Sequence, residues 1–138
     1  MPFDQIVLPD RNALFARASG RITLQDIRDS YARYLDDPAY IPGQTQIFDF
    51  EDVVDVDMDY PQMTALVAMT YASYAAQPMI THAAIYAPDD IAFGMARMFE
   101  LAYGENPHYR ILVTRSAREA LDWSGYPQLI IDELRASL

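Results

Sequence analysis

The sequence contains no cysteine and no lysine, and each absence excludes a class of chemistry. Without cysteine, the chain has no disulfide, no thiolate metal ligand and no cysteine nucleophile. Without lysine, it has neither a Schiff-base amine nor the lysine of a phosphate-binding loop. All ten basic residues are therefore arginines.

Positive charge is scarce as well, because 20 acidic residues face 10 arginines and the net charge is −10. This charge repels nucleic-acid phosphates and anionic lipid surfaces, so we expect no nucleic-acid partner. The 138 residues are enough for one domain, residues 1–138, with a single core. Because Met1 to Gln5 has neither a basic start nor a long apolar run, we predict a cytoplasmic protein.

A third absence is local, since residues 60–88 contain no Asp, Glu or Arg. Their first part should form a helix from Tyr60 to Gln77. A helix without a charged face is normally covered on more than one side, by its own domain, a second subunit or a ligand. Polar residues such as Gln62 and Thr70 interrupt the window, whereas a membrane span needs about 20 predominantly apolar residues. We therefore expect a binding surface here and no membrane span.

Apolar periodicity predicts a regular alternation of strands and helices along the chain. Two short β-type runs flank a turn and should form an antiparallel hairpin, with Gly20 ending the second strand. The predicted strands are 3–8, 13–18, 44–50, 81–87 and 110–114, and the predicted helices are 24–36, 60–77, 89–103, 117–123 and one from Pro127 onward. This order predicts an α/β fold, in which helices pack on a mixed, mostly parallel five-stranded sheet through right-handed crossovers.

Cap signals mark several of the predicted helix boundaries. Thr23 should cap the first helix with Asp26 at its third position, and Ser116 should do the same with Glu119. Gly104 is placed to end the third helix in a left-handed conformation.

Three stretches of the sequence together resemble a known family. They are the strand Gln46–Phe50 with its acidic tail, the phrase from Ala87 to Met98, and the closing strand with the helix Ser116–Trp123. With the predicted hairpin, they resemble bacterial STAS domains similar to anti-sigma-factor antagonists, in a branch of unassigned function. The resemblance spans nearly the whole chain and implies a STAS-like fold that binds partners rather than catalysing a reaction.

This sequence departs from the family pattern at one important position. In regulatory members, a serine or threonine at the start of the helix after the central strand is phosphorylated and switches the choice of partner. Residues 55–61 contain neither residue type. Asp57 or Asp59 in that place could imitate the phosphate permanently, with about half its charge. The resemblance therefore carries no functional residue over to this chain.

A dense acidic stretch precedes the uncharged helix and is the obvious candidate for cation binding. Asp55, Asp57 and Asp59 match the first ligand positions of a calcium loop, but Tyr60 and Leu66 replace its glycine and its glutamate. We expect a solvated acidic loop whose charge favours the start of the next helix. Paired carboxylates for acid–base catalysis are an open alternative.

Candidate catalytic groups do not form a recognisable set in the sequence. His82 and His108 are the only imidazoles, too few for a three-histidine zinc site, and we expect both to be structural. Neither a glycine-flanked serine elbow nor a phosphate-cradling glycine loop occurs. We predict no enzyme, no cofactor and no metal site, with an enzyme using Asp57, Asp59 or His82 as a third alternative.

Helical spacing assigns faces on two of the predicted helices. In the helix 89–103, the predicted sheet-facing residues are Ile91, Met95, Met98, Phe99 and Ala102, while Phe93 lies opposite, beside Arg97 and Glu100. In the uncharged helix, the predicted core residues are Met63, Leu66, Val67, Tyr71 and Tyr74, and those outside are Ala65, Met69, Ala72 and Ala76. Small residues and methionine on an outer face permit close approach of another helix.

These observations predict a non-enzymatic protein-interaction or regulatory module of STAS type that lacks the phospho-acceptor serine. Its partner would be a second copy, giving a homodimer, or another protein, with the uncharged helix, Phe93 and Arg97 as contact surface. The alternative is a carrier of a small apolar molecule or lipid. Met69, Tyr71, Tyr74 and Met79 would then line an apolar pocket with a few polar groups.

Overall fold

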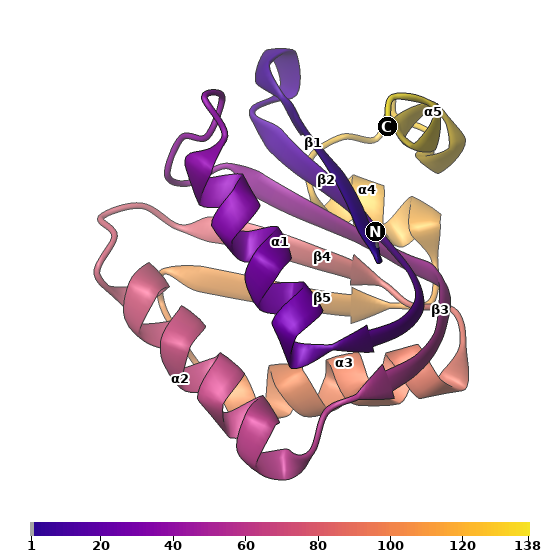
Figure 1. Cartoon of the computed structure of the whole chain (residues 1–138). Coiled ribbons are helices and arrows are strands. Elements are labelled where there is room, and N and C mark those ends of the chain that lie inside the picture. The colour runs from indigo at the N-terminus through magenta and orange to yellow at the C-terminus, as the bar shows by residue number, and fades with distance from the viewer. Residues whose placement is uncertain (1) are drawn as a thin grey trace.

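The computed structural model describes residues 2–138 as one five-stranded sheet with helices on both faces (Figure 1). The strands are β1 (Phe3–Leu8), β2 (Ala13–Thr23), β3 (Thr45–Asp57), β4 (Thr81–Tyr86) and β5 (Tyr109–Thr114). The helices are η1 (Pro9–Arg11), α1 (Leu24–Asp36), α2 (Tyr60–Ala75), α3 (Asp90–Tyr103), α4 (Ala117–Trp123) and α5 (Ile131–Ala136).

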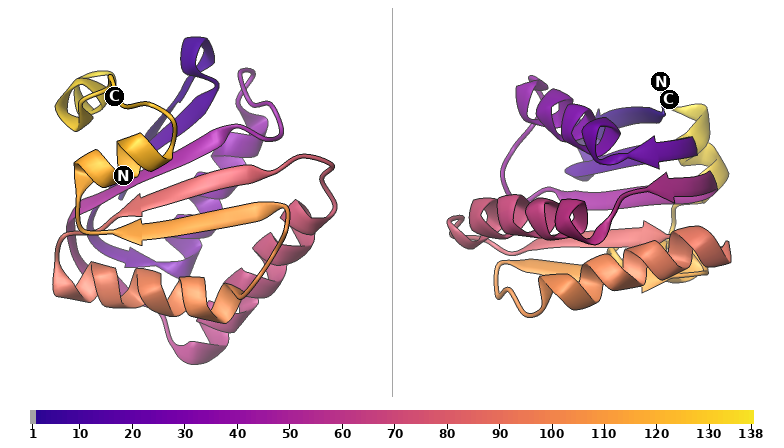
Figure 2. Two further views of the ribbon diagram at one scale, coloured as in Figure 1. Left: turned by 180° about the vertical axis from the view of Figure 1, so that it is seen from behind. Right: turned by 60° about the horizontal axis from the view of Figure 1, so that its bottom comes forward.

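The strands lie across the sheet in the order in which they occur in the chain. β1 pairs antiparallel with β2, and the remaining pairs are parallel. Because every crossover moves one strand in the same direction, right-handed connections place α1, α2 and α3 on one face. Figure 2 shows α4 and α5 covering the opposite face. The predicted α/β fold with a mixed, mostly parallel sheet is confirmed.

The helix ends predicted from local cap signals mostly agree with the structure. The Thr23 hydroxyl accepts from the Asp26 amide and the Asp26 carboxylate accepts from the Thr23 amide, which completes a capping box at α1. Ser116 accepts from the Glu119 amide at α4. Gly104 ends α3 with φ 67°, a left-handed conformation that favours glycine.

Two strands run further than the sequence indicated. Gly20 does not end β2, which passes through it with φ 72° and an irregular register. The predicted acidic loop is also wrong, because that stretch forms the second half of β3. Arginines explain the extension: Arg21 on β2 forms ion pairs with Asp55 at 3.5 Å and Asp57 at 2.9 Å on the neighbouring strand. Opposite charges on neighbouring strands stabilise strand pairing, whereas the aspartates of β3 without these arginines would disfavour it.

The sheet separates two apolar layers. Alternating strand residues send Leu14 and Ala16 toward α1, α2 and α3, whereas Phe15 and Ile47 point to the back layer. The buried back layer contains Phe15, Ile47, Leu121, Leu129 and Leu134. α5 begins at Ile131, four residues later than Pro127, where the sequence suggested a start.

The face that α3 turns to the sheet differs from the predicted one. Ala92 and Ala96 are buried, whereas Ile91 is 54% exposed and Met98 is 48% exposed. The prediction favoured the larger apolar side chains, but a helix that lies close to a sheet accommodates alanine at the contact. Phe99 does pack against the core, as expected.

On α2 the predicted core residues Met63, Leu66 and Tyr74 are buried, and Thr70 joins them. No helix within residues 2–138 is long and apolar enough to cross a membrane.

Candidate binding site on the two sides of helix α2

Helix α2 begins at a well-defined cap. The Asp59 carboxylate accepts from the Gln62 amide at 2.8 Å, and the Gln62 side chain accepts from the Asp59 amide at 3.0 Å. Pro61 occupies the first turn, where its missing N–H costs nothing. The switch-region candidates Asp57 and Asp59 thus have structural contacts, an ion pair with Arg21 and a helix cap, respectively.

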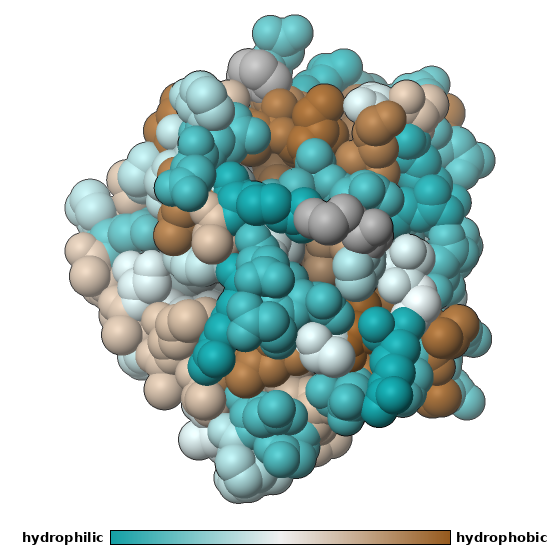
Figure 3. All heavy atoms as spheres, viewed as in Figure 1, coloured by the Kyte–Doolittle hydropathy of each residue, from teal (hydrophilic) through white to brown (hydrophobic). Residues whose placement is uncertain are grey.

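A cavity of about 140 Å³ lies between the inner side of α2 and the sheet. Side chains of α1 and α3 complete its walls, and those of β3 and β5 form part of its floor. Four methionines line it, namely Met58, Met63, Met69 and Met95. Met69 is also 36% exposed. In Figure 3, strongly hydrophobic atoms reach the surface in the region where α1, α2 and α3 converge in Figure 1.

The cavity has a polar strip in a wall that is otherwise mostly apolar. Gln46 projects from β3, donates to the Tyr74 hydroxyl at 2.7 Å and accepts from the Tyr109 hydroxyl at 2.8 Å. Nearby, the Tyr34 hydroxyl donates to the Gln44 side chain at 2.9 Å. The strip consists of neutral groups that face the cavity.

Burial keeps these phenols protonated. Desolvation raises the pKa of Tyr34, Tyr74 and Tyr109 above the ordinary tyrosine value. For Tyr103, which packs against Tyr109, desolvation raises the pKa to about 12. These four tyrosines are therefore hydrogen-bonding groups rather than anions at neutral pH.

The outer side of α2 is exposed and carries no ionised side chain. Ala65, Ala68, Ala72 and Ala75 lie along it. On the neighbouring helix α3, Leu101 is 70% exposed, and the misassigned Ile91 and Met98 are also exposed. Pale to tan atoms cover the position of α2 in Figure 3, which matches a surface of alanine and other weakly hydropathic residues.

The remaining predicted contact residues occupy different places. Tyr74 lines the cavity, whereas Tyr71 is half-buried beside it, and the Tyr71 hydroxyl donates to the Glu105 carbonyl. Phe93 is half-buried beneath the Arg115 guanidinium, 4.2 Å from the ring centre. Arg97 is exposed and pairs with Glu100 on its own helix. The structure therefore brings Met69 and Tyr74 together, and leaves Phe93 and Arg97 outside the cavity.

Met79 was also expected to line a pocket. Its side chain instead packs next to Gly43, in the loop before β3, so this residue does not line the cavity.

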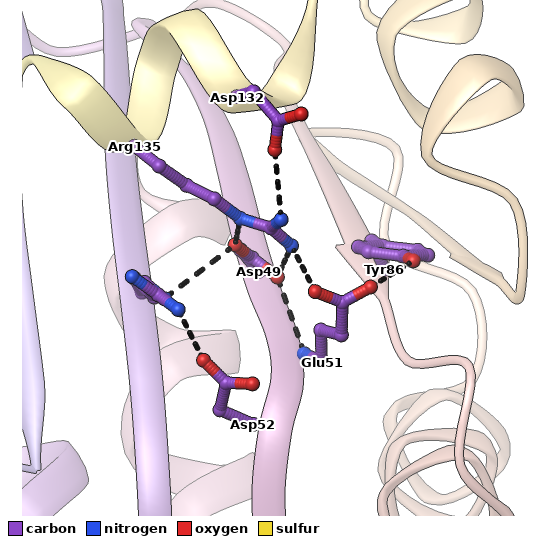
Figure 4. Close-up of polar contacts among 7 residues, drawn as sticks. Asp49, Glu51, Asp52, Tyr86, Asp132 and Arg135 are labelled. Carbon is purple, nitrogen blue, oxygen red and sulfur yellow. Dashed lines mark hydrogen bonds and ion pairs between the residues drawn. The ribbon is translucent and has the colours of Figure 1, made fainter.

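The acidic residues at the centre of β3 belong to an ion-pair network on the back of the sheet (Figure 4). Asp49 is fully buried and accepts from Arg135 of α5 at 2.6 and 3.2 Å. Glu51 pairs with the same guanidinium at 2.7 Å. On the other side, Arg17 Nε lies 4.0 Å from the Asp49 carboxylate. Hydrogen bonding to Asp49 raises the pKa of Arg135, so the guanidinium stays charged.

These contacts show why the acidic stretch is not an open carboxylate cluster. The acids of β3 pair with three arginines: Asp49 and Glu51 with Arg135, Asp52 with Arg17, and Asp55 and Asp57 with Arg21. No group of three or more metal-ligating side chains converges within residues 2–138. The His82 ring packs against Trp123, and His108 Nδ1 lies 3.3 Å from the Met79 carbonyl. Each histidine therefore has a structural contact.

Sequence reasoning missed the polar floor of the cavity and the buried ion pair. Gln46 carried a signal, because it is a polar residue in an apolar strand whose alternate positions face the helices. Arg135 carried none, since an arginine in a short terminal helix ordinarily lies in solvent. No family model matches the chain, and no curated protein matches its sequence.

Proposed function

We propose that the protein is a non-enzymatic interaction module that forms a homodimer through the outer faces of α2 and α3. The observation that carries the proposal is the exposed outer face of α2, which has no ionised side chain, on a chain whose net charge is −10. Two copies with this charge repel each other at most orientations. An uncharged face is where they approach with the smallest electrostatic cost.

The side chains on this face also suit a helix-to-helix contact. Alanines at positions 65, 68, 72 and 75 recur at the three- and four-residue spacing of one helical stripe. Small residues let two backbones come close, and the neighbouring helix α3 carries the exposed apolar residues Met98 and Leu101. A two-fold axis would place α2 of one copy against α2 of the other, so that each surface serves both partners.

The resemblance to anti-sigma-factor antagonists supports a regulatory role for such a module. In that case Asp57 or Asp59 would stand in the place of the phosphorylated residue. Both carboxylates already have partners within the chain, which favours a structural role for their charge over a permanent switch. A regulatory partner would then recognise the α2 surface itself.

Sedimentation equilibrium of the purified protein over a wide concentration range tests the proposal. The wild type should sediment as a dimer, and Ala68→Arg, which places a charge at the centre of the face, should sediment as a monomer with an unchanged circular dichroism spectrum. Ile130→Arg is the matched control, because it adds the same charge to an exposed apolar residue on the α5 side of the sheet. This variant should remain a dimer.

Two results would contradict dimerisation through this face. One is a wild-type protein that stays monomeric at the highest concentration. The other is a dimer that survives Ala68→Arg and Met98→Arg together, which would place the contact elsewhere. Ala68→Arg is preferred to Met69→Arg because Met69 also lines the cavity, so that change would affect both sides of α2.

A further inference from the structure

The size of the cavity behind α2 limits what it can enclose. Its volume is about 140 Å³. A dry cavity of about 150 Å³ lined by apolar side chains in another protein binds benzene, whereas sites for drug-sized ligands begin near 300 Å³. The space therefore fits a single ring and is too small to enclose the acyl chains of a lipid.

The lining excludes charged occupants. Among the described residues that line the cavity there is no Asp, Glu, Arg or His. A carboxylate or an ammonium group would lose its hydration on entry and meet no opposite charge, which is unfavourable by several kcal/mol or more. The occupant must be neutral.

The polar strip supplies one place for a hydrogen bond. The Tyr74 hydroxyl accepts from the Gln46 amide, so it retains its own proton, which can rotate toward an acceptor in the cavity. The Tyr109 hydroxyl donates to Gln46 and holds that amide in position. Elsewhere, Thr70 donates to the Leu66 carbonyl and Tyr31 pairs with Ser73. The arrangement favours a ligand with one acceptor oriented toward Tyr74.

Four methionines make the rest of the wall adaptable. Met58 precedes α2, Met63 and Met69 lie on α2, and Met95 lies on α3; Met63 is buried, whereas Met69 is partly exposed. Unbranched thioether side chains fill irregular gaps and make favourable contacts with aromatic rings. We propose that this cavity binds a neutral molecule the size of one aromatic ring that carries a single hydrogen-bond acceptor. The inference does not depend on dimerisation, because the cavity lies on the inner side of α2.

The methionines also provide the test. The protein with ¹³C-labelled methionine methyl groups would be titrated with phenol, with benzene as the apolar probe and benzoate as the charged one. Phenol should cause saturable shifts of the Met58, Met63, Met69 and Met95 methyl signals. Met79 and Met98 do not line the cavity and are internal controls, so their signals should not move. Benzene should bind more weakly than phenol, and benzoate should not bind.

Two conservative variants separate the hydrogen bond from the cavity. Tyr74→Phe should weaken phenol binding about fivefold, the value of one neutral hydrogen bond, while benzene binding stays unchanged. Tyr71→Phe is the matched control on the same helix, since its hydroxyl donates to the Glu105 carbonyl outside the cavity. It should leave both affinities unchanged.

If Tyr74→Phe does not fold, Leu66→Phe provides a second route. This change fills the cavity from α2 and should abolish binding of both phenol and benzene. The proposal is overturned if phenol causes no saturable shift, if the Met79 and Met98 signals shift with the other four, or if benzoate binds as tightly as phenol. It is also overturned if Leu66→Phe binds phenol as the wild type does.

Discussion

Replacement of Arg135 by methionine should lower the free energy of unfolding by about 3 kcal/mol, because it leaves the Asp49 carboxylate buried without its main partner. Asp49 is 0% exposed, and its two closest charged contacts are the guanidinium atoms of Arg135 at 2.6 and 3.2 Å. Removal of one member of a buried ion pair costs about 3–5 kcal/mol. Arg17 Nε, 4.0 Å away, compensates in part, which places the expected loss at the lower end.

Other contributions to this change are small. Methionine keeps an unbranched apolar stem in place of the arginine methylenes, so the effect measures charge rather than packing. Arg135 also pairs with Asp132, which is 80% exposed, and exposed pairs contribute about 0–1 kcal/mol. The exposed pair of Arg97 with Glu100 offers the control: Arg97→Met should cost less than about 1 kcal/mol.

Urea denaturation followed by circular dichroism measures these differences through the shift of the midpoint. A double variant sharpens the test, because Asp49→Leu combined with Arg135→Met removes both charges. It should be more stable than Arg135→Met alone, since a buried ion pair replaced by apolar groups is often neutral. The reasoning is refuted if Arg135→Met costs less than about 1 kcal/mol, or if the double variant is the less stable of the two.

Two further predictions concern α2 and the buried tyrosines. Burial raises the pKa of four tyrosines, Tyr34, Tyr74, Tyr103 and Tyr109, so the unfolded chain releases their protons at a lower pH than the folded chain. The free energy of unfolding should therefore be unaffected by these groups below pH 10. Above pH 10 it should fall, by at most about 1.4 kcal/mol per pH unit for each group. Phenolate absorbance should show these four tyrosines titrating only with unfolding, and a single titration of all ten near pH 10 would contradict this. Asp59→Ala removes the α2 cap and should cost about 1 kcal/mol in urea denaturation, whereas Asp59→Asn should cost much less; equal losses would disprove the cap.

Local signals in the sequence were sufficient for much of the fold. The hairpin turn, the Thr23 and Ser116 caps and the left-handed Gly104 each depend on residues a few positions apart, and all three types of signal agree with the structure. The alternation of strand and helix then determined the sheet, because right-handed crossovers leave few topologies.

Features that depend on distant partners were not predictable in this way. The acidic stretch is a strand because Arg21 on β2 lies opposite Asp55 and Asp57, and that register is invisible in a single sequence. The polar strip joins Gln46 to residues 28 and 63 positions away, and Arg135 reaches across 86 positions to Asp49. The sheet-facing side of α3 was predicted wrongly because the prediction favoured large apolar side chains. In the structure, the buried alanines let the helix lie close to the sheet.

The order of the strands has a consequence for how the chain folds while it is being made. Each strand from β2 to β5 pairs with the one synthesised just before it, so the sheet can grow at one edge as residues leave the ribosome, without inserting a strand between two others. The back layer of the core forms later, because Asp49 can pair with Arg135 only after α5 has been synthesised. During synthesis the Asp49 carboxylate is therefore exposed to water until α5 packs against the sheet and buries it.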